Sequence, residues 1–164
     1  LNITILQLPK LAEFGEYAFA HLSNPASILT LSNMSILASI ERYTFKASEA
    51  SVTLDFMPSL SKIESYAFTQ FAGNLTTGAM PSLEKIESYA FYGASGVFHI
   101  VADLPTLTYI GEAAFYQSYH PDTLVNLQIF WISRHFLLSR FGNFEERSFS
   151  SLIQMLTSSS LKLR

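Results

Sequence analysis

The chain reads Met57-Pro-Ser-Leu-Ser-Lys-Ile-Glu-Ser-Tyr-Ala-Phe68 and, 23 residues later, Met80-Pro-Ser-Leu-Glu-Lys-Ile-Glu-Ser-Tyr-Ala-Phe91. The two segments differ only where Ser61 is replaced by Glu84. A fixed period in the twenties is typical of a solenoid, in which each repeat forms one coil that stacks on the next. This pair of segments therefore predicts the architecture of the chain.

The same pattern occurs five times, with starts 26, 23, 23 and 24 residues apart. The pattern has twelve positions. An apolar residue at position 1 is usually followed by Pro, position 4 is Leu and position 7 is Ile or Phe. Positions 8 and 9 are polar or small, position 10 is usually Tyr, position 11 is Ala or Thr, and position 12 is Phe. The copies are Leu8–Phe19, Met34–Phe45, Met57–Phe68, Met80–Phe91 and Leu104–Phe115. A sixth, degenerate copy is predicted at Leu138–Phe149 after a step of 34 residues. We attribute its extra length to an insertion, which a loop tolerates at little cost in closure entropy.

A short run with alternating apolar residues precedes each clear copy and suits a β-strand. The runs are 2–7, 28–32, 52–56, 74–79 and 97–102. Counting back from the first residue of each copy predicts which two residues of each strand face the core. In the first four strands these are Ile3 and Ile5, Leu29 and Leu31, Val52 and Leu54, and Leu75 and Thr77. The register of the fifth run is open, because its coil is one residue longer. Strands that return after a crossover in every coil lie parallel.

The segments around Tyr66 and Tyr89 are too short for more than one helical turn, so we expect 3₁₀ or α turns there. The sequence thus predicts an α/β repeat solenoid. A right-handed coil carries a parallel β-sheet on one face and short helical turns or irregular segments on the other. The structural core is predicted from the repeated Leu, Ile and Phe positions. These are Leu11, Phe19, Leu37, Phe45, Leu60, Ile63, Phe68, Leu83, Ile86, Phe91, Leu107, Ile110 and Phe115.

Length and composition fit one domain over residues 1–164, with clear repeats to about residue 119 and a degenerate part beyond. The 164 residues are 49% apolar, enough to bury a continuous core. A net charge of −3 lacks the basic excess typical of nucleic-acid binders. With no cysteine in the sequence, disulfides and zinc–thiolate sites are excluded. The apolar run 124–138 is interrupted by Asn126, Gln128, Arg134 and His135, so it is not expected to span a membrane.

The repeated pattern Leu-Pro-x-Leu-x-x-Ile-x-x-Tyr-Ala-Phe resembles the BspA-like, or Treponema-type, leucine-rich repeats. The resemblance covers about residues 1–119 well and residues 120–164 poorly. It implies a leucine-rich-repeat coil of a surface protein that serves adhesion and protein binding without catalysis. Many members of that family carry a cysteine shortly after the Ala-Phe pair, whereas here Phe91 is followed by Tyr92 and Gly93.

Titratable residues show no catalytic or metal-binding arrangement, and we expect no cofactor. The four histidines, His21, His99, His120 and His135, fall at different places in their coils, with no ligand spacing between them. Glu41, Glu64 and Glu87 share one column beside Lys62 and Lys85. An acidic ladder for a cation is one interpretation. We favour a solvated face on which diagonal Glu41–Lys62 and Glu64–Lys85 pairs offset the stacked negative charges.

The outward side of the strands is the candidate binding face. It is predicted to carry Thr30, Thr53, Thr76, Ile100 and Trp131. A threonine ladder on a flat parallel sheet also fits ice binding, but β-propensity alone places threonine there. Phe98, Phe130 and Trp131 fit either an apolar anchor for a partner or the closure of the core.

We therefore expect a non-catalytic adhesion module of a cell-surface or secreted protein, whose partners are host matrix proteins or another cell surface. An intracellular scaffold for protein–protein interaction is the alternative. Neither end of the chain shows a polar cap, although the end coils of solenoids need one. This predicts a fragment of a longer array, or self-association through bare ends.

Overall fold

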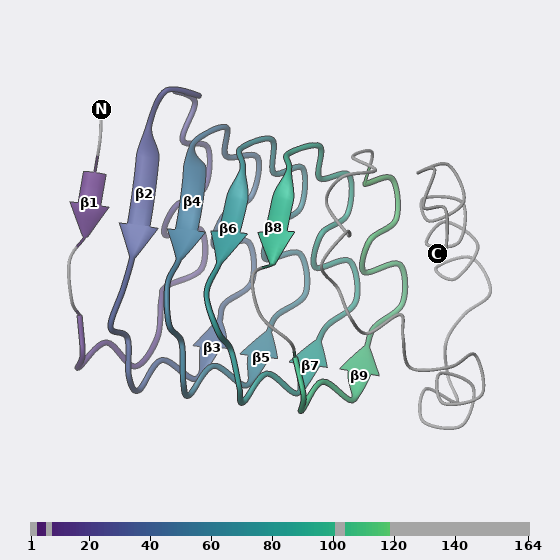
Figure 1. Ribbon diagram of the computed structural model, residues 1–164. Coiled ribbons are helices and arrows are strands. Elements are labelled where there is room, and N and C mark those ends of the chain that lie inside the picture. The colour runs from purple at the N-terminus through teal and green to yellow at the C-terminus, as the bar shows by residue number, and fades with distance from the viewer. Residues whose placement is uncertain (1–2, 6–7, 101–103, 119–164) are drawn as a thin grey trace, which may run out of the picture.

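A computed structural model shows two parallel β-sheets, to each of which the successive coils add one strand (Figure 1). The structure describes residues 3–5, 8–100 and 104–118. The five-stranded sheet has the order β1-β2-β4-β6-β8, with bounds Ile3–Ile5, Ile28–Leu31, Ser51–Leu54, Leu75–Thr77 and Phe98–Ile100. The four-stranded sheet has the order β3-β5-β7-β9, with bounds Ser39–Ile40, Lys62–Ile63, Lys85–Ile86 and Tyr109–Ile110.

The five-stranded sheet has the predicted register through its first four strands. The pairs expected to face the core are buried in β2, β4 and β6, where they are Leu29 and Leu31, Val52 and Leu54, and Leu75 and Thr77. In β1 the backbone of Ile3–Ile5 pairs in register with Leu29–Leu31. The prediction is confirmed in β2, β4 and β6, because a period of two turns both residues of each pair inward and the residue between them outward.

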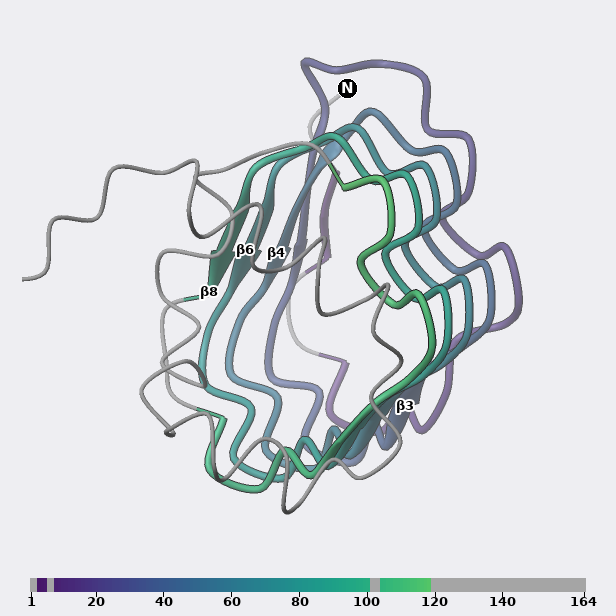
Figure 2. The same cartoon turned by 90° about the vertical axis from the view of Figure 1, so that its right-hand side faces the viewer.

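The four-stranded sheet was not predicted. Each of its strands has two residues, too few for an alternating pattern to stand out in the sequence. The isoleucines Ile40, Ile63 and Ile86 are buried on its inner side, and Ile110 packs against the same core. The coil thus has a sheet along two of its sides, as the end-on view in Figure 2 shows.

The Tyr-Ala-Phe segments form the irregular alternative rather than helical turns, since the described residues include no helix. Tyr66 has φ of 61° and ends a tight turn in which Ala67 N donates to Glu64 O over 3.2 Å. This left-handed backbone breaks any helix after one turn. The next amide, Phe68 N, instead donates to Ala90 O of the neighbouring coil over 2.7 Å. Hydrogen bonds between coils have replaced those that a helix would form within itself.

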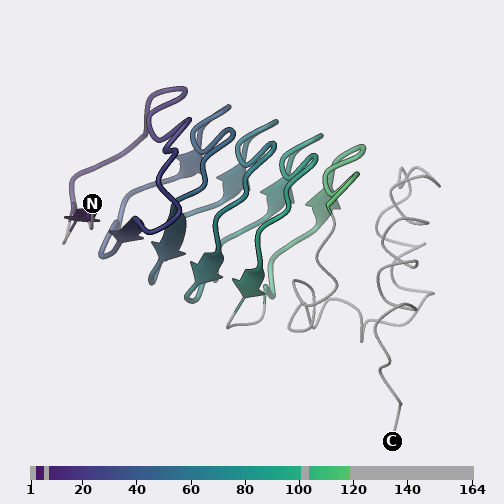
Figure 3. The same cartoon turned by 90° about the horizontal axis from the view of Figure 1, so that it is seen from above.

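One continuous core fills the space between the two sheets. Eight of the residues predicted for it are buried: Leu37, Phe45, Leu60, Ile63, Phe68, Leu83, Ile86 and Phe91. The other five, at the ends of the described array, are partly buried and pack against it: Leu11, Phe19, Leu107, Ile110 and Phe115. Figure 3 shows the coils following one another along the array, which gives the same core position to every repeat.

Stacked aromatic rings run through this core from coil to coil. We call Phe19, Phe45, Phe68, Phe91 and Phe115 the phenylalanine ladder. Consecutive ring centroids lie 5.3, 4.8, 5.0 and 5.0 Å apart, and the rings deviate from parallel by 16° at most. Parallel strands bring identical residues to a spacing of about 4.8 Å, so the repeat itself dictates the stack.

Neighbouring coils approach each other closely where the chain enters the five-stranded sheet. A Cβ atom on Gly96 would overlap the carbonyl oxygen of Gly73, and one on Gly73 would overlap that of Ala50. The amides of Gly73 and Gly96 donate to Ser48 O and Phe71 O at 3.2 and 3.3 Å. Glycine is therefore required here by contact between backbones.

Candidate functional site

The outward side of the five-stranded sheet carries an aligned column of polar side chains. Thr30, Thr53 and Thr76, which we call the threonine column, are paired neighbours in the register of β2, β4 and β6. All three are half-buried. Ile28 and Phe56, near opposite ends of the strands, are about half exposed, at 49% and 52%. The structure thus brings three of the predicted binding-face residues together.

The fourth position of the column is occupied by His99 rather than Ile100. The register of β6 and β8 pairs Thr76 with His99 and Thr77 with Ile100. Ile100 is thus the register partner of Thr77, and the backbone partner of Thr76 in the column is His99 instead of Ile100. Counting back from Leu104 failed because the extra residue of this coil lies between β8 and the next copy of the pattern.

Phe98 belongs to the core and is not an exposed anchor. It is 4% exposed, and its ring lies 6.3 Å from that of Phe71 and 5.2 Å from that of Phe91. Phe130, Trp131 and the degenerate copy at 138–149 lie outside the described residues, and so do His120 and His135.

A second aromatic stack lies outside the core, on the side of the coil away from the five-stranded sheet. It consists of Tyr17, Tyr43, Tyr66 and Tyr89, which we call the tyrosine ladder. Consecutive ring centroids lie 4.9, 5.4 and 5.1 Å apart, and the rings deviate from parallel by 17°, 26° and 3°. All four residues have φ between 59° and 61°. The left-handed backbone turns each tyrosine outward, while the phenylalanine two residues later lies in the core or packs against it.

Sequence reasoning missed this ladder as a surface feature. The signal was present, since four of the five clear copies carry tyrosine two residues before the final phenylalanine. The sequence pattern predicts helical turns at these tyrosines and does not indicate on which side of the coil their rings lie.

Two cations accompany the ladder at its N-terminal end. The Arg42 guanidinium carbon lies 4.9 Å from the ring centroid of Tyr43 and 5.4 Å from that of Tyr66. Lys46 Nζ lies 5.2 Å from the ring centroid of Tyr43 and 6.0 Å from that of Tyr17. Cations within about 6 Å of a ring centroid are attracted by the ring electrons. At the other end of the ladder, Tyr89 Oη donates to Glu112 Oε1 over 3.3 Å.

The carboxylate column pairs differently from the prediction. Lys62 Nζ contacts Glu64 Oε1 of its own coil at 2.8 Å and Glu87 Oε1 of the next coil at 3.3 Å. Lys62 was expected to pair with Glu41, but Glu41 accepts a hydrogen bond from Ser39 Oγ instead. The hydrogen bond to Glu64, and then that to Glu87, raise the pKa of Lys62 against the opposing effect of its partial burial. Lys62 therefore bridges two carboxylates that would otherwise repel each other.

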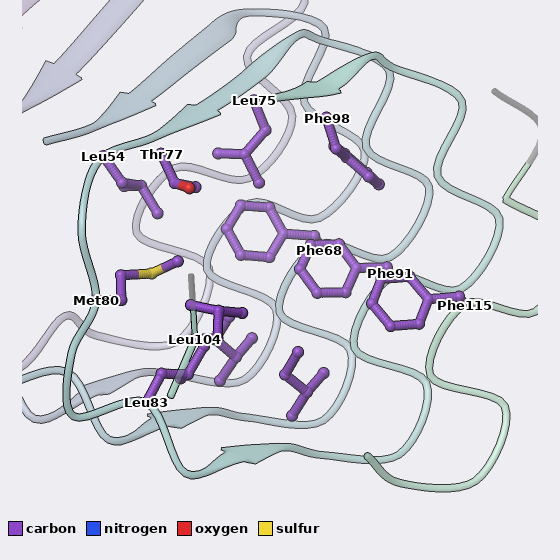
Figure 4. A pocket seen from close by; sticks show the side chains of 12 residues that line it. Leu54, Phe68, Leu75, Thr77, Met80, Leu83, Phe91, Phe98, Leu104 and Phe115 are labelled. Carbon is purple, nitrogen blue, oxygen red and sulfur yellow. The ribbon is translucent and has the colours of Figure 1, made fainter. Parts of the chain in front are cut away.

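The core contains a cavity of about 20 Å³ towards the C-terminal end of the described array (Figure 4). Its lining includes Phe68, Phe91, Phe98 and Phe115, and among the described residues that line it Thr77 alone has a polar side chain. Thr77 Oγ1 is buried and has no hydrogen-bond partner in the part of the chain that the structure describes. The space would admit one water molecule, but a buried water needs two to four polar partners. This void is a packing defect rather than a ligand site.

Metal sites and membrane spans are absent from residues 3–5, 8–100 and 104–118. No three histidine or acidic side chains there gather closely enough to hold a metal ion. No helical segment of the same residues has the length and apolar character needed to cross a bilayer.

Comparison with known families agrees with this geometry. The family described as BspA type leucine rich repeat region matches residues 12–131 in six copies, which is more than half of the chain. The match ends before the degenerate copy predicted at 138–149, which stays a prediction. No curated protein and no solved structure matches the chain. The matched family and the stacked parallel coils agree, and the chain belongs to the BspA-type leucine-rich repeat family.

Proposed function

We propose that this chain is the protein-binding part of a cell-surface or secreted protein, and that it acts in adhesion without catalysis. Leucine-rich repeats are typically non-catalytic modules for protein interaction, which supports the general class. The resemblance to surface proteins of this repeat type supports the location. An intracellular scaffold built on the same coil is the alternative.

The observation that carries the proposal is the ordered outward face of the five-stranded sheet. The threonine column and His99 lie in neighbouring strands whose backbones are paired in register. A face held in this way loses little conformational freedom on binding, so the entropy cost of ordering it is small. Exposed Ile28 and Phe56 add apolar area near the two edges of the face, of the kind that marks protein contacts.

The face fits a protein better than it fits ice. An ice-binding ladder requires the same short polar side chain in every strand, but His99 follows Thr76 in the column. A mixed row of hydroxyl and imidazole groups beside apolar residues is usual at protein interfaces, which combine polar and apolar contacts.

The location is tested by treating intact producer cells with a protease and probing for the domain with an antibody. Loss of the signal without lysis is expected. A signal that survives until the cells are opened would contradict the adhesion proposal and favour the intracellular scaffold.

The binding face is tested by substitution once a partner has been found by screening host matrix proteins and neighbouring microbial cells. Thr53→Arg places a long cation in the middle of the face and is expected to abolish binding. Ala38→Arg is the matched control, because Ala38 is exposed next to β3 of the other sheet. Equal binding by the wild type and both variants would show that the partner binds elsewhere.

A further inference from the structure

We propose that the N-terminal half of the tyrosine ladder is a second binding surface, which takes an acidic segment of a protein partner. The surface consists of Tyr17, Tyr43, Tyr66, Arg42 and Lys46, and we call it the tyrosine–cation patch. It lies on the turns that follow the four-stranded sheet, on the side of the coil away from the five-stranded sheet (Figure 2). The proposal is independent of the binding face described above.

The first argument is that the two cations of the patch have no carboxylate partner among the described residues. The ion pairs formed within 4.0 Å in that part of the chain both involve Lys62, with Glu64 and Glu87. Glu41, which precedes Arg42, is engaged by Ser39 Oγ. Arg42 and Lys46 therefore keep their charge available while their side chains are positioned by tyrosine rings.

The second argument is the orientation of the rings. Because Tyr43 has neighbours at 4.9 and 5.4 Å on its two sides, its ring faces are covered within the stack. Tyr43 and Tyr66, which have a stacked ring on each side, thus offer ring edges and phenol groups to a ligand. The edge of an aromatic ring is its positive part, whereas the face is negative. Edges beside Arg42 and Lys46 favour an anion.

The third argument concerns hydrogen bonding at the centre of the patch. Arg42 Nη2 donates to Tyr43 Oη over 3.2 Å. A phenol that accepts a hydrogen bond in this way can direct its own proton towards another acceptor. A carboxylate placed there would receive one bond from Tyr43 and a charge-assisted bond from Arg42.

The modest charge of the patch favours an acidic protein segment over a polyanion. A sulfated polysaccharide or a nucleic acid is normally held by many cations, whereas this patch has two and the chain carries a net charge of −3. Tyrosine and arginine are the residues enriched at the energetic centres of protein interfaces. At its other end the ladder contacts Glu112, which would repel an acidic segment and so limit it to the N-terminal half.

The test uses the full chain and follows the assigned backbone and tyrosine ring signals by NMR. The probe is a short peptide of alternating Asp and Leu residues, compared with one in which Asn replaces Asp. We expect the acidic peptide to shift the signals of Tyr17, Tyr43 and Tyr66, and the Asn peptide to leave them unchanged. Combining Arg42→Gln with Lys46→Gln is expected to weaken binding about tenfold or more. Binding should also weaken as salt is raised.

The control variant is Lys85→Gln, which removes an exposed cation of β7 outside the patch and should leave peptide affinity unchanged. The proposal is overturned if the acidic peptide shifts no patch signals, or if Lys85→Gln weakens binding as much as the patch variants do. It is also overturned if heparin binds the patch and the peptide does not, since the partner would then be a sulfated polysaccharide.

Discussion

The two aromatic ladders share one repeat and nearly one geometry, yet they differ in environment. Phe68 and Tyr66 lie two residues apart, and their rings stack on the next coil with centroids 5.0 and 5.1 Å apart. Phe68 is fully buried in the core, whereas Tyr66 lies half-buried at the surface. The spacing of the coils is therefore enough to stack the rings in both ladders, and the burial of the rings decides the role of each ladder. The buried ladder stabilises the coil, and the surface ladder is available to a partner.

The largest expected effect comes from removing one ring from the buried ladder. Phe68→Ala should lower the free energy of unfolding by about 3–5 kcal/mol, because it leaves a cavity beside Phe45 and Phe91. Tyr66→Ala is the matched variant and should cost about 1–2 kcal/mol, since it loses ring stacking but little burial. Urea titration measures both values. A loss below about 1 kcal/mol for Phe68→Ala would show that this residue is not part of the core.

Crowding between backbones should give the next largest effect. Gly96→Ala adds a Cβ atom that overlaps the carbonyl oxygen of Gly73 and forces the two coils apart. We expect a loss of about 1–3 kcal/mol in urea titration, as for other overpacked sites. Gly93→Ala is the comparison variant. Among the described residues, the Cβ atom added at Gly93 would meet only the flexible side chain of Gln70, whose Cγ lies 3.7 Å away, so no contact between backbones is involved. Its cost would come from the φ of 64°, which strains alanine. A Gly96→Ala variant that loses no stability would contradict the contact argument, since the two coils would then accommodate the added atom without cost.

A stabilising change is expected where the core holds an unpaired hydroxyl. Thr77→Val keeps the shape of the side chain and removes Oγ1, which is buried beside the cavity and has no partner among the described residues. The free energy of unfolding should rise by about 1 kcal/mol. Thr53→Val on the outward face should change it by less. A loss of stability in Thr77→Val would mean that the hydroxyl has a partner, such as an ordered water.

The smallest effect concerns the surface pair around Lys62. Its pKa is raised in the folded state, chiefly by the hydrogen bond to Glu64, so the charged form favours folding. This contribution is complete below lysine's ordinary pKa and is lost as pH rises through the raised value. The urea midpoint of the wild type should thus fall slightly more than that of Lys62→Gln between about pH 9 and about pH 11.5. An equal fall of the urea midpoint in the wild type and in Lys62→Gln would show that the ion pairs of Lys62 add nothing measurable to stability, as for many surface ion pairs.

Much of the fold was predictable because identical residues recur at a fixed spacing. The buried positions of β2, β4 and β6 followed from counting back to Met34, Met57 and Met80. The same count failed at β8, where one extra residue before Leu104 moved His99 outward. The spacing of a repeat predicts strand register only while the connection between strand and motif keeps its length.

The tyrosine ladder shows what the repeat pattern could not predict. Its geometry depends on a left-handed backbone at Tyr17, Tyr43, Tyr66 and Tyr89, which is rare for bulky residues. The outward stacking and the contacts with Arg42 and Lys46 follow from that conformation. The threonine column needed no such information, because alternation along a strand already places Thr30, Thr53 and Thr76 outside.

The division of roles between the two ladders is tested most directly by measuring stability and peptide binding together in Tyr43→Ala. The account predicts that this variant stays folded, with a loss of about 1–2 kcal/mol in the free energy of unfolding. Its affinity for the acidic Asp-Leu peptide should fall about tenfold or more. A variant that unfolds as readily as Phe68→Ala, or one that binds the peptide like the wild type, would contradict the account.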